Sequence, residues 1–248
     1  MRQTLRIGFS ALFILLAWQA LVSLGELPHY ILPSPTRVAE TLWESRVLIA
    51  THTWVTTLEI LLGLLIGILL GVLTALWMVH SAVARYLLQP LLVLTQALPV
   101  FALAPLFTLW LGYGMASKIL VAVLIIYFPV ASAFFDGLMQ TPRGWMDLAK
   151  VMGADSKQLL WRIRIPAALP SFASGLRLAA VYAPIGAVIG EWVGASQGLG
   201  YLMLLANGRA KIDLMFAALF VLALLTLLLH YGVGKVCDRL VERYRSQL

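Results

Sequence analysis

Residues 60–84 read ILLGLLIGILLGVLTALWMVHSAVA and contain no Asp, Glu, Lys or Arg. A helix needs roughly 20 apolar residues to cross about 30 Å of hydrocarbon, so this stretch alone is long enough to span a bilayer. Within lipid every backbone N–H and C=O needs a partner from the protein itself, which a helix provides and an irregular chain does not. The stretch therefore predicts an integral membrane protein built from helices.

The composition of the whole chain points to the same class of protein. Of its 248 residues, 61% are hydrophobic and 12% are charged, and the mean hydropathy is +0.92. In ordinary soluble domains, roughly 45–50% of the residues are hydrophobic and about 25% are charged. No charge-dense stretch is present, which excludes disordered regions and nucleic-acid-binding arms. The single cysteine, Cys237, cannot form an intrachain disulfide, and no Cys/His cluster has metal-ligand spacing, so we expect no metal site.

Uncharged runs elsewhere extend the prediction to an all-α fold with six transmembrane helices in one domain, residues 1–248. The first run follows Arg2 and Arg6 as a signal peptide would, but it is long and lacks a clear cleavage site, so we expect it to be retained. The six spans are predicted at about residues 7–25, 57–79, 87–111, 117–137, 171–192 and 214–234.

The basic residues predict the orientation of these spans, because short cytoplasmic loops carry an excess of Lys and Arg. With both termini in the cytoplasm, most of the 18 Lys and Arg residues fall on the cytoplasmic side. The exceptions, which fall on the outer side, are Arg37, Arg46, Lys118, Arg209 and Lys211. On that outer side, the prolines at 33 and 35 and a helical pattern after them suggest either a short amphipathic surface helix or a plain connector.

The longest cytoplasmic segment, residues 140–170, is the densest basic stretch of the chain. Its pattern predicts two short helices: Gly153 interrupts the first, Asp155 or Ser156 begins the second, and Pro166 ends it. Leu148, Val151 and Met152 would share one face of the first helix. Since this face is too short to enter a bilayer and too apolar to be left bare, we expect a protein surface to cover it.

This segment resembles the EAA signature of ABC importer permeases, in which Glu-Ala-Ala precedes a glycine and a later Ile-x-Leu-Pro. Residues 147–149 (Asp-Leu-Ala), Gly153 and residues 163–166 (Ile-Arg-Ile-Pro) keep the spacing, with Asp replacing Glu, Leu replacing the first Ala and Ile replacing Leu. The resemblance implies a coupling loop that binds an ATP-hydrolysing subunit. The resemblance assigns these residues to the coupling of the permease to that subunit: Asp147, Ala149, Gly153, Ala154, Leu159, Ile163 and Pro166.

Other motifs carry the resemblance along most of the chain. Residues 32–35 (LPSP), 109–114 (LWLGYG) and 191–195 (EWVGA) are similar to the nitrate, sulfonate and taurine branch of these permeases. Within this branch, residues 190–203 followed by residues 212–217 look most like permeases associated with pyrimidine precursors of thiamine. The resemblance implies a type I importer in the bacterial cytoplasmic (inner) membrane. Such an importer has two permeases, two ATPases and an extracytoplasmic binding protein. We expect the second permease to be another copy of this chain.

The chain lacks the motifs that would make it an enzyme. No G-x-x-x-x-G-K-[ST] phosphate-binding loop occurs, so ATP and Mg²⁺ are expected on the partner ATPase. No set of catalytic residues is present either. The alternative function is an ion-gradient-driven secondary transporter, which would need ionisable residues within the membrane; only Glu59 and Glu191 are candidates.

Several residues within the spans are predicted to have particular roles. Glu191 matches an acidic position of the family and is expected at the outer gate, whereas Glu59 is expected in a surface salt bridge with Arg46 as a candidate partner. Gln96, Pro99 and Phe101 are expected near the translocation path, since prolines interrupt helices where these line a cavity. The four histidines are expected at membrane interfaces. Close helix packing is expected of two glycine stripes, Gly63, Gly67, Gly71 and Gly186, Gly190, Gly194.

Overall fold

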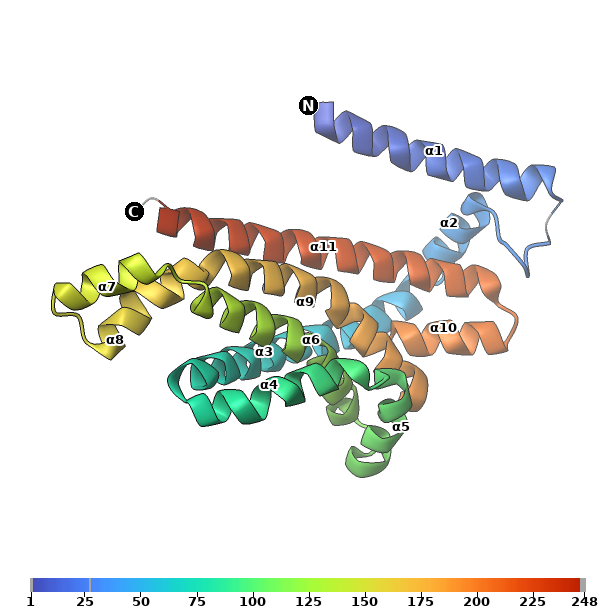
Figure 1. Cartoon of the computed structure of the whole chain (residues 1–248). Helices are drawn as coiled ribbons and strands as arrows, with labels where there is room; N and C mark the ends of the chain where they lie inside the picture. The colour runs from blue at the N-terminus through green and yellow to red at the C-terminus, as the bar shows by residue number, and fades with distance from the viewer. Residues whose placement is uncertain (1, 27, 246–248) are drawn as a thin grey trace.

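The computed structural model describes residues 2–26 and 28–245, and within them every regular element is a helix (Figure 1). This confirms the all-α prediction. The helices are α1 (Arg2–Leu24), α2 (Pro35–Glu44), α3 (Arg46–His80), α4 (Ala82–Ala97), α5 (Val100–Leu111), α6 (Met115–Met139), α7 (Arg143–Val151), α8 (Ser156–Leu159), η1 (Leu160–Arg164, a π-helix), α9 (Ile165–Gly194), α10 (Leu199–Gly208) and α11 (Ile212–Arg245).

The long apolar helices correspond to the expected spans. Among the described residues, four continuous stretches are long and apolar enough to cross a membrane, namely α3, α6, the stretch from α8 through α9, and α11. The third expected span is instead a pair, α4 and α5, bent by 102°. The break falls at Leu98 and Pro99, because proline lacks the N–H that a continuing helix requires. The first expected span lies in α1, whose residues Leu12–Leu24 form a shorter apolar helix.

One helix boundary differs from the expectation at the first long span. α3 begins at Arg46, before the expected start of the span near residue 57, so the helix continues into the segment that was expected to lie on the membrane surface. The amphipathic helix of that segment is α2, whose N-cap Ser34 accepts a hydrogen bond from the N–H of Arg37. The Arg37 guanidinium also forms an ion pair with Asp213 at 2.8 Å, which ties α2 to the start of α11.

The centre of the bundle is α6, which packs between α3 and α9. The glycine stripe of α3 lies at the contact with α6, and in α9 Gly186 and Gly190 contact α6 while Gly194 contacts α5. A Cβ placed on Gly67 would come within 2.9 Å of the Ile126 side chain, and one on Gly186 within 2.7 Å of the Ala122 backbone. Such short distances show that the helix axes approach closely because no side chain intervenes.

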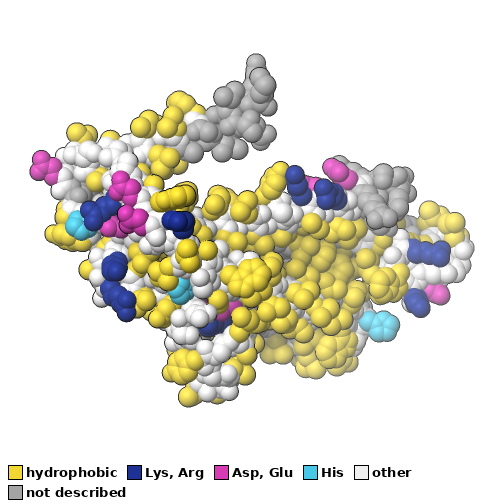
Figure 2. Space-filling model, turned by 180° about the vertical axis from the view of Figure 1, so that it is seen from behind, with side chains coloured by type: hydrophobic (Ala, Val, Ile, Leu, Met, Phe, Trp, Pro, Cys, Tyr) yellow, Lys and Arg dark blue, Asp and Glu magenta, His cyan; other side chains and the backbone are white. Residues whose placement is uncertain are grey.

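The charged side chains gather at two ends of the molecule, and hydrophobic side chains cover the face between them (Figure 2). One end carries the loop between α6 and α9, with Arg143, Lys150 and Lys157. The opposite end carries α2 and the segment between α10 and α11. This arrangement places the loop and α10 at opposite ends of α9.

Candidate functional site

The loop between α6 and α9 is a helix–turn–helix whose turn is fixed by Gly153. At φ +84° this residue adopts the left-handed conformation that favours glycine. The N–H of Gly153 donates to the carbonyl of Lys150 and the N–H of Ala154 to that of Ala149, both at 2.9 Å. These two bonds form a Schellman motif, which ends α7 sharply and satisfies its last carbonyls.

The second arm of the loop begins at Asp155. Its carboxylate accepts the N–H of Gln158 at 2.6 Å, and its own N–H donates to the Gln158 side chain at 3.1 Å. This capping box starts α8. The expectation that Pro166 ends this helix was wrong, because the chain passes through the π-helical turn η1 and continues as α9. Pro166 lies in the first turn of α9, where the missing N–H of proline is tolerated.

Apolar side chains cover the outward surface of this loop. Val151 is 87% exposed, Met152 79% and Leu148 62%. We call these three residues the apolar patch of the loop. Trp161 of the second arm is also exposed. An exposed apolar surface of this kind between charged side chains is typical of a protein–protein contact.

The residues that the family resemblance assigns to ATPase coupling include both buried and exposed members of the loop. Ala149, Leu159 and Pro166 are buried, and Ile163 is half-buried. Asp147 is exposed, with a carboxylate oxygen 3.9 Å from the Lys150 ammonium, and Gly153 and Ala154 lie at the turn between the arms.

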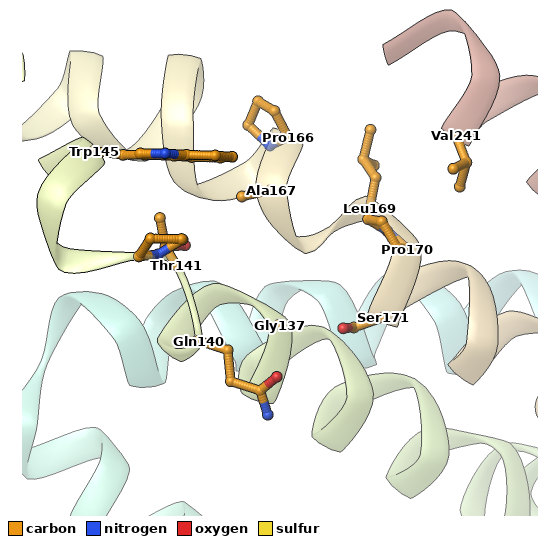
Figure 3. Close-up of a pocket in the computed structure, with 11 residues that line it drawn as sticks. Gly137, Gln140, Thr141, Trp145, Pro166, Ala167, Leu169, Pro170, Ser171 and Val241 are labelled. Carbon is orange, nitrogen blue, oxygen red and sulfur yellow. The ribbon is translucent and has the colours of Figure 1, made fainter. Parts of the chain in front are cut away.

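A cavity of about 450 Å³ separates the loop from the bundle (Figure 3). Trp145 and Pro166 lie on its loop side, while Gln140 and Ser171 line the side formed by α6 and α9. Val241 of α11 contributes to the wall. The loop is therefore joined to the bundle mainly through the ends of α6 and α9.

The bend between α4 and α5 carries Gln96, Pro99 and Phe101, and all three are exposed in the single chain. Phe101 is 57% exposed, and Thr108 is the buried residue of α5 that packs on Gly194. The three expected path residues thus lie at or beside the bend and are open to contact from outside the single chain. The other expected path residue, Glu191, lies elsewhere and is 1% exposed.

Glu191 belongs to a buried polar cluster that the sequence did not predict. Its carboxylate accepts the Thr56 hydroxyl at 2.6 Å and the N–H of Gly200. The Thr56 oxygen in turn accepts the N–H of Leu199 at 2.7 Å, and the Nδ1 atom of His52 accepts the N–H of Gly198 at 2.9 Å. Four elements, α3, α9, α10 and the α9–α10 connection, meet in this cluster.

Glu59 and Lys118 add an ion pair beside the cluster, with Nζ and Oε1 3.2 Å apart. Their side chains are 0% and 7% exposed. The surface salt bridge expected for Glu59 was therefore wrong, because Glu59 pairs with Lys118 and Arg46 instead contacts the Trp43 carbonyl and ring. His52, one of the four histidines expected at membrane interfaces, is buried within the protein.

No group of three or more His, Cys, Asp or Glu side chains with metal-binding geometry occurs among the described residues.

Comparison with protein families gives a match over residues 67–242 to the family described as "Binding-protein-dependent transport system inner membrane component". A probable ABC transporter permease protein of Haemophilus influenzae is 53% identical over 228 residues, which cover 92% of this chain and 93% of that protein. Among solved structures, an inward-facing MetNI methionine ABC transporter has a TM-score of 0.62 at 18% identity, over 81% of this chain and 98% of the other. The latter likeness supports the fold.

Two relatives named for a substrate are equally similar to this chain. The formylaminopyrimidine transport permease ThiX of Halalkalibacterium halodurans is 40% identical and covers 95% of this chain and 94% of its own length. The riboflavin permease RibX of Chloroflexus aurantiacus is also 40% identical, over 95% of this chain and 88% of its own. The taurine permease TauC of Escherichia coli is 30% identical, over 96% and 88%. These matches confirm the predicted sulfonate and taurine branch.

Proposed function

This chain belongs to the family of binding-protein-dependent transport system inner membrane components and is the permease subunit of an ABC importer, and from this premise we propose that it transports a planar nitrogen heterocycle. Formylaminopyrimidine, a pyrimidine precursor of thiamine, is the first candidate. The observation that carries this choice is the 40% identity to ThiX along nearly the whole chain. Riboflavin, named for the equally similar RibX, contains a fused pyrimidine ring and belongs to the same chemical class.

The surface at the α4–α5 bend supports an uncharged aromatic substrate. Residues 86–117 contain no Asp, Glu, Lys or Arg, so this segment offers no cation to hold a sulfonate or a nitrate ion. Phe101 offers a ring for stacking, and the Gln96 amide can both donate to and accept from the edge of a heterocycle. With a second copy related by a twofold axis, two such surfaces would enclose one path.

The apolar patch of the loop is the proposed contact with the ATPase. Leu148, Val151 and Met152 would enter a groove of that subunit, and the sharp turn at Gly153 would keep the two arms at a fixed angle. ATP and Mg²⁺ would bind to the partner, and closure of two ATPases would draw two loops together. The path would then open toward a docked binding protein, and hydrolysis would reset it. In this orientation the loop and both termini lie in the cytoplasm.

The substrate assignment predicts the outcome of an uptake assay in proteoliposomes that contain the importer and its binding protein. We expect ATP-dependent uptake of radiolabelled formylaminopyrimidine. A tenfold excess of unlabelled formylaminopyrimidine should abolish the uptake, riboflavin should reduce it less, and taurine or nitrate should leave it unchanged. Uptake of taurine in place of the pyrimidine would contradict the proposal. Uptake that follows an imposed proton or sodium gradient without ATP would favour the secondary transporter.

A further inference from the structure

The start of α10 is held by side chains from other helices. The first N–H groups of a helix have no partner within it. Here three successive ones, from Gly198, Leu199 and Gly200, donate to side chains of α3 and α9. A Cβ on Gly198, which has φ +116°, would overlap the Glu191 carboxyl group, so the close fit requires glycine at this position. These three hydrogen bonds therefore hold the start of α10 against α3 and α9.

Glu191 is the centre of that attachment. A buried carboxylate is stable only where hydrogen bonds and opposite charge replace its lost hydration. The Glu191 carboxylate accepts hydrogen bonds from the Thr56 hydroxyl and the Gly200 N–H. It also lies at the N-terminus of α10, where the helix dipole stabilises a negative charge. Thr56 bridges the two partners, because the same oxygen that donates to Glu191 accepts the Leu199 N–H. Removing Glu191 or the Thr56 hydroxyl would leave donors of α10 without acceptors.

The two helices that Glu191 joins, α9 and α10, lead from this contact toward opposite ends of the molecule. Glu191 lies in the last turn of α9, and the same helical stretch, Ser156–Gly194, begins in the loop that carries the apolar patch. At roughly 1.5 Å per residue, a straight α-helix of 39 residues would be about 58 Å long. The far end of α10 leads into residues 207–211, all of them exposed and including Arg209 and Lys211. Figure 1 shows α10 and the loop at opposite ends of α9.

We propose that Glu191 is a positioning residue that links α10 to α9, so that docking of the binding protein at residues 207–211 is transmitted along α9 to the ATPase-coupling loop. The partner surface at this segment would be acidic, to match Arg209 and Lys211. This inference rests on the proposed function and on the proposed orientation of the loop. It assigns Glu191 to the communication between the two ends of the importer rather than to the lining of the path.

Stimulation of ATP hydrolysis tests this inference. The importer is reconstituted in nanodiscs with its ATPase, and the rate of hydrolysis is measured with and without the binding protein purified from the same cells. The variants are Glu191→Gln, which removes the charge at constant shape, and Thr56→Val, which removes the bridging hydroxyl. Thr57→Val is the matched control, since the Thr57 hydroxyl donates only within its own helix, to the carbonyl of Thr53.

We expect Glu191→Gln and Thr56→Val to keep the basal rate of each assembled complex and to lose most of the stimulation by the binding protein, about tenfold, which is the scale of a lost hydrogen bond to a charged group. The concentration of binding protein for half-maximal stimulation should rise. Thr57→Val should behave as the wild type. Rates are measured on the monodisperse complex only, so that a loss of yield does not count as a loss of coupling.

A merely structural role would lower the melting temperature of both variants and leave the stimulation ratio and the half-maximal concentration as in the wild type; that result would overturn the inference. Thr56→Val leaves the carboxylates of Glu59 and Glu191 in place. It therefore tests the link between α10 and α9 even if the Glu191→Gln complex does not assemble. Absence of stimulation in the wild type would instead contradict the proposed function, and the inference with it.

Discussion

A Gly153→Asp variant is expected to lose at least about 99% of ATP-dependent transport while the membrane-spanning helices stay folded. Aspartate is one of the few residues with a side chain that tolerates the left-handed conformation of Gly153, and nothing lies within 4 Å of a Cβ placed there. The free chain can therefore accept the substitution. The new carboxylate would stand beside Val151 and Met152, and the docked ATPase would bury it without a partner. An uncompensated buried charge costs roughly 3–5 kcal/mol, which corresponds to more than 100-fold in binding.

Uptake into proteoliposomes and recovery of the ATPase by affinity purification measure this effect. Gly144→Asp is the matched control, because Gly144 also has open space around it and adds the same charge to the same arm, near the start of α7. Acidic residues are favourable in the first turn of a helix, so this variant should keep most of its transport. Equal transport by Gly153→Asp and the wild type would show that the turn is not part of a docking surface.

Lys118→Met should destabilise the folded chain by about 3–5 kcal/mol, the cost of leaving the buried Glu59 carboxylate without its partner. The expected result is a large decrease in the melting temperature of the protein in mild detergent, or no recovery of folded protein. The double variant Glu59→Gln, Lys118→Met should recover most of the lost stability, since both charges are then absent. Such recovery in the double variant would show that the pair interacts directly.

The exposed pair of Asp147 and Lys150 provides the control for this cycle. Their charged atoms are 3.9 Å apart and both side chains are largely exposed, so Lys150→Met should produce no measurable change in melting temperature. The account of the buried pair would be contradicted if Lys118→Met melted at the wild-type temperature. It would also be contradicted if the double variant were no more stable than Lys118→Met alone.

The spans could be predicted from the sequence because bilayer thickness alone determines how long an uncharged helix must be. The helix–turn–helix of the loop could be predicted as well, since the spacing of Gly153 and Asp155 follows local rules for ending and starting helices. The continuation of the helix past Pro166 could not. It depends on the π-helical turn of residues 160–164, which no local pattern of apolar residues indicates.

The buried cluster could not be predicted for a different reason. Thr56, Lys118 and Glu191 lie on three different helices, far apart in the sequence, and only the packing of α3 and α9 against α6 brings them together. The pairing of Lys118 with Glu59 depends on a contact across that packing. The glycines that permit this close packing, such as Gly190 against Lys118, were the only local signal.

The central claim is that this loop binds an ATPase, and copurification tests it most directly. The native chain and a variant with residues 147–166 replaced by a Gly/Ser linker are purified from native membranes in mild detergent, and the bound proteins are identified by mass spectrometry. We predict that an ATPase is recovered with the native chain and is absent from the linker variant, although both chains are present in the membrane in similar amounts. Equal recovery of the ATPase with both chains, or with neither, would contradict the account.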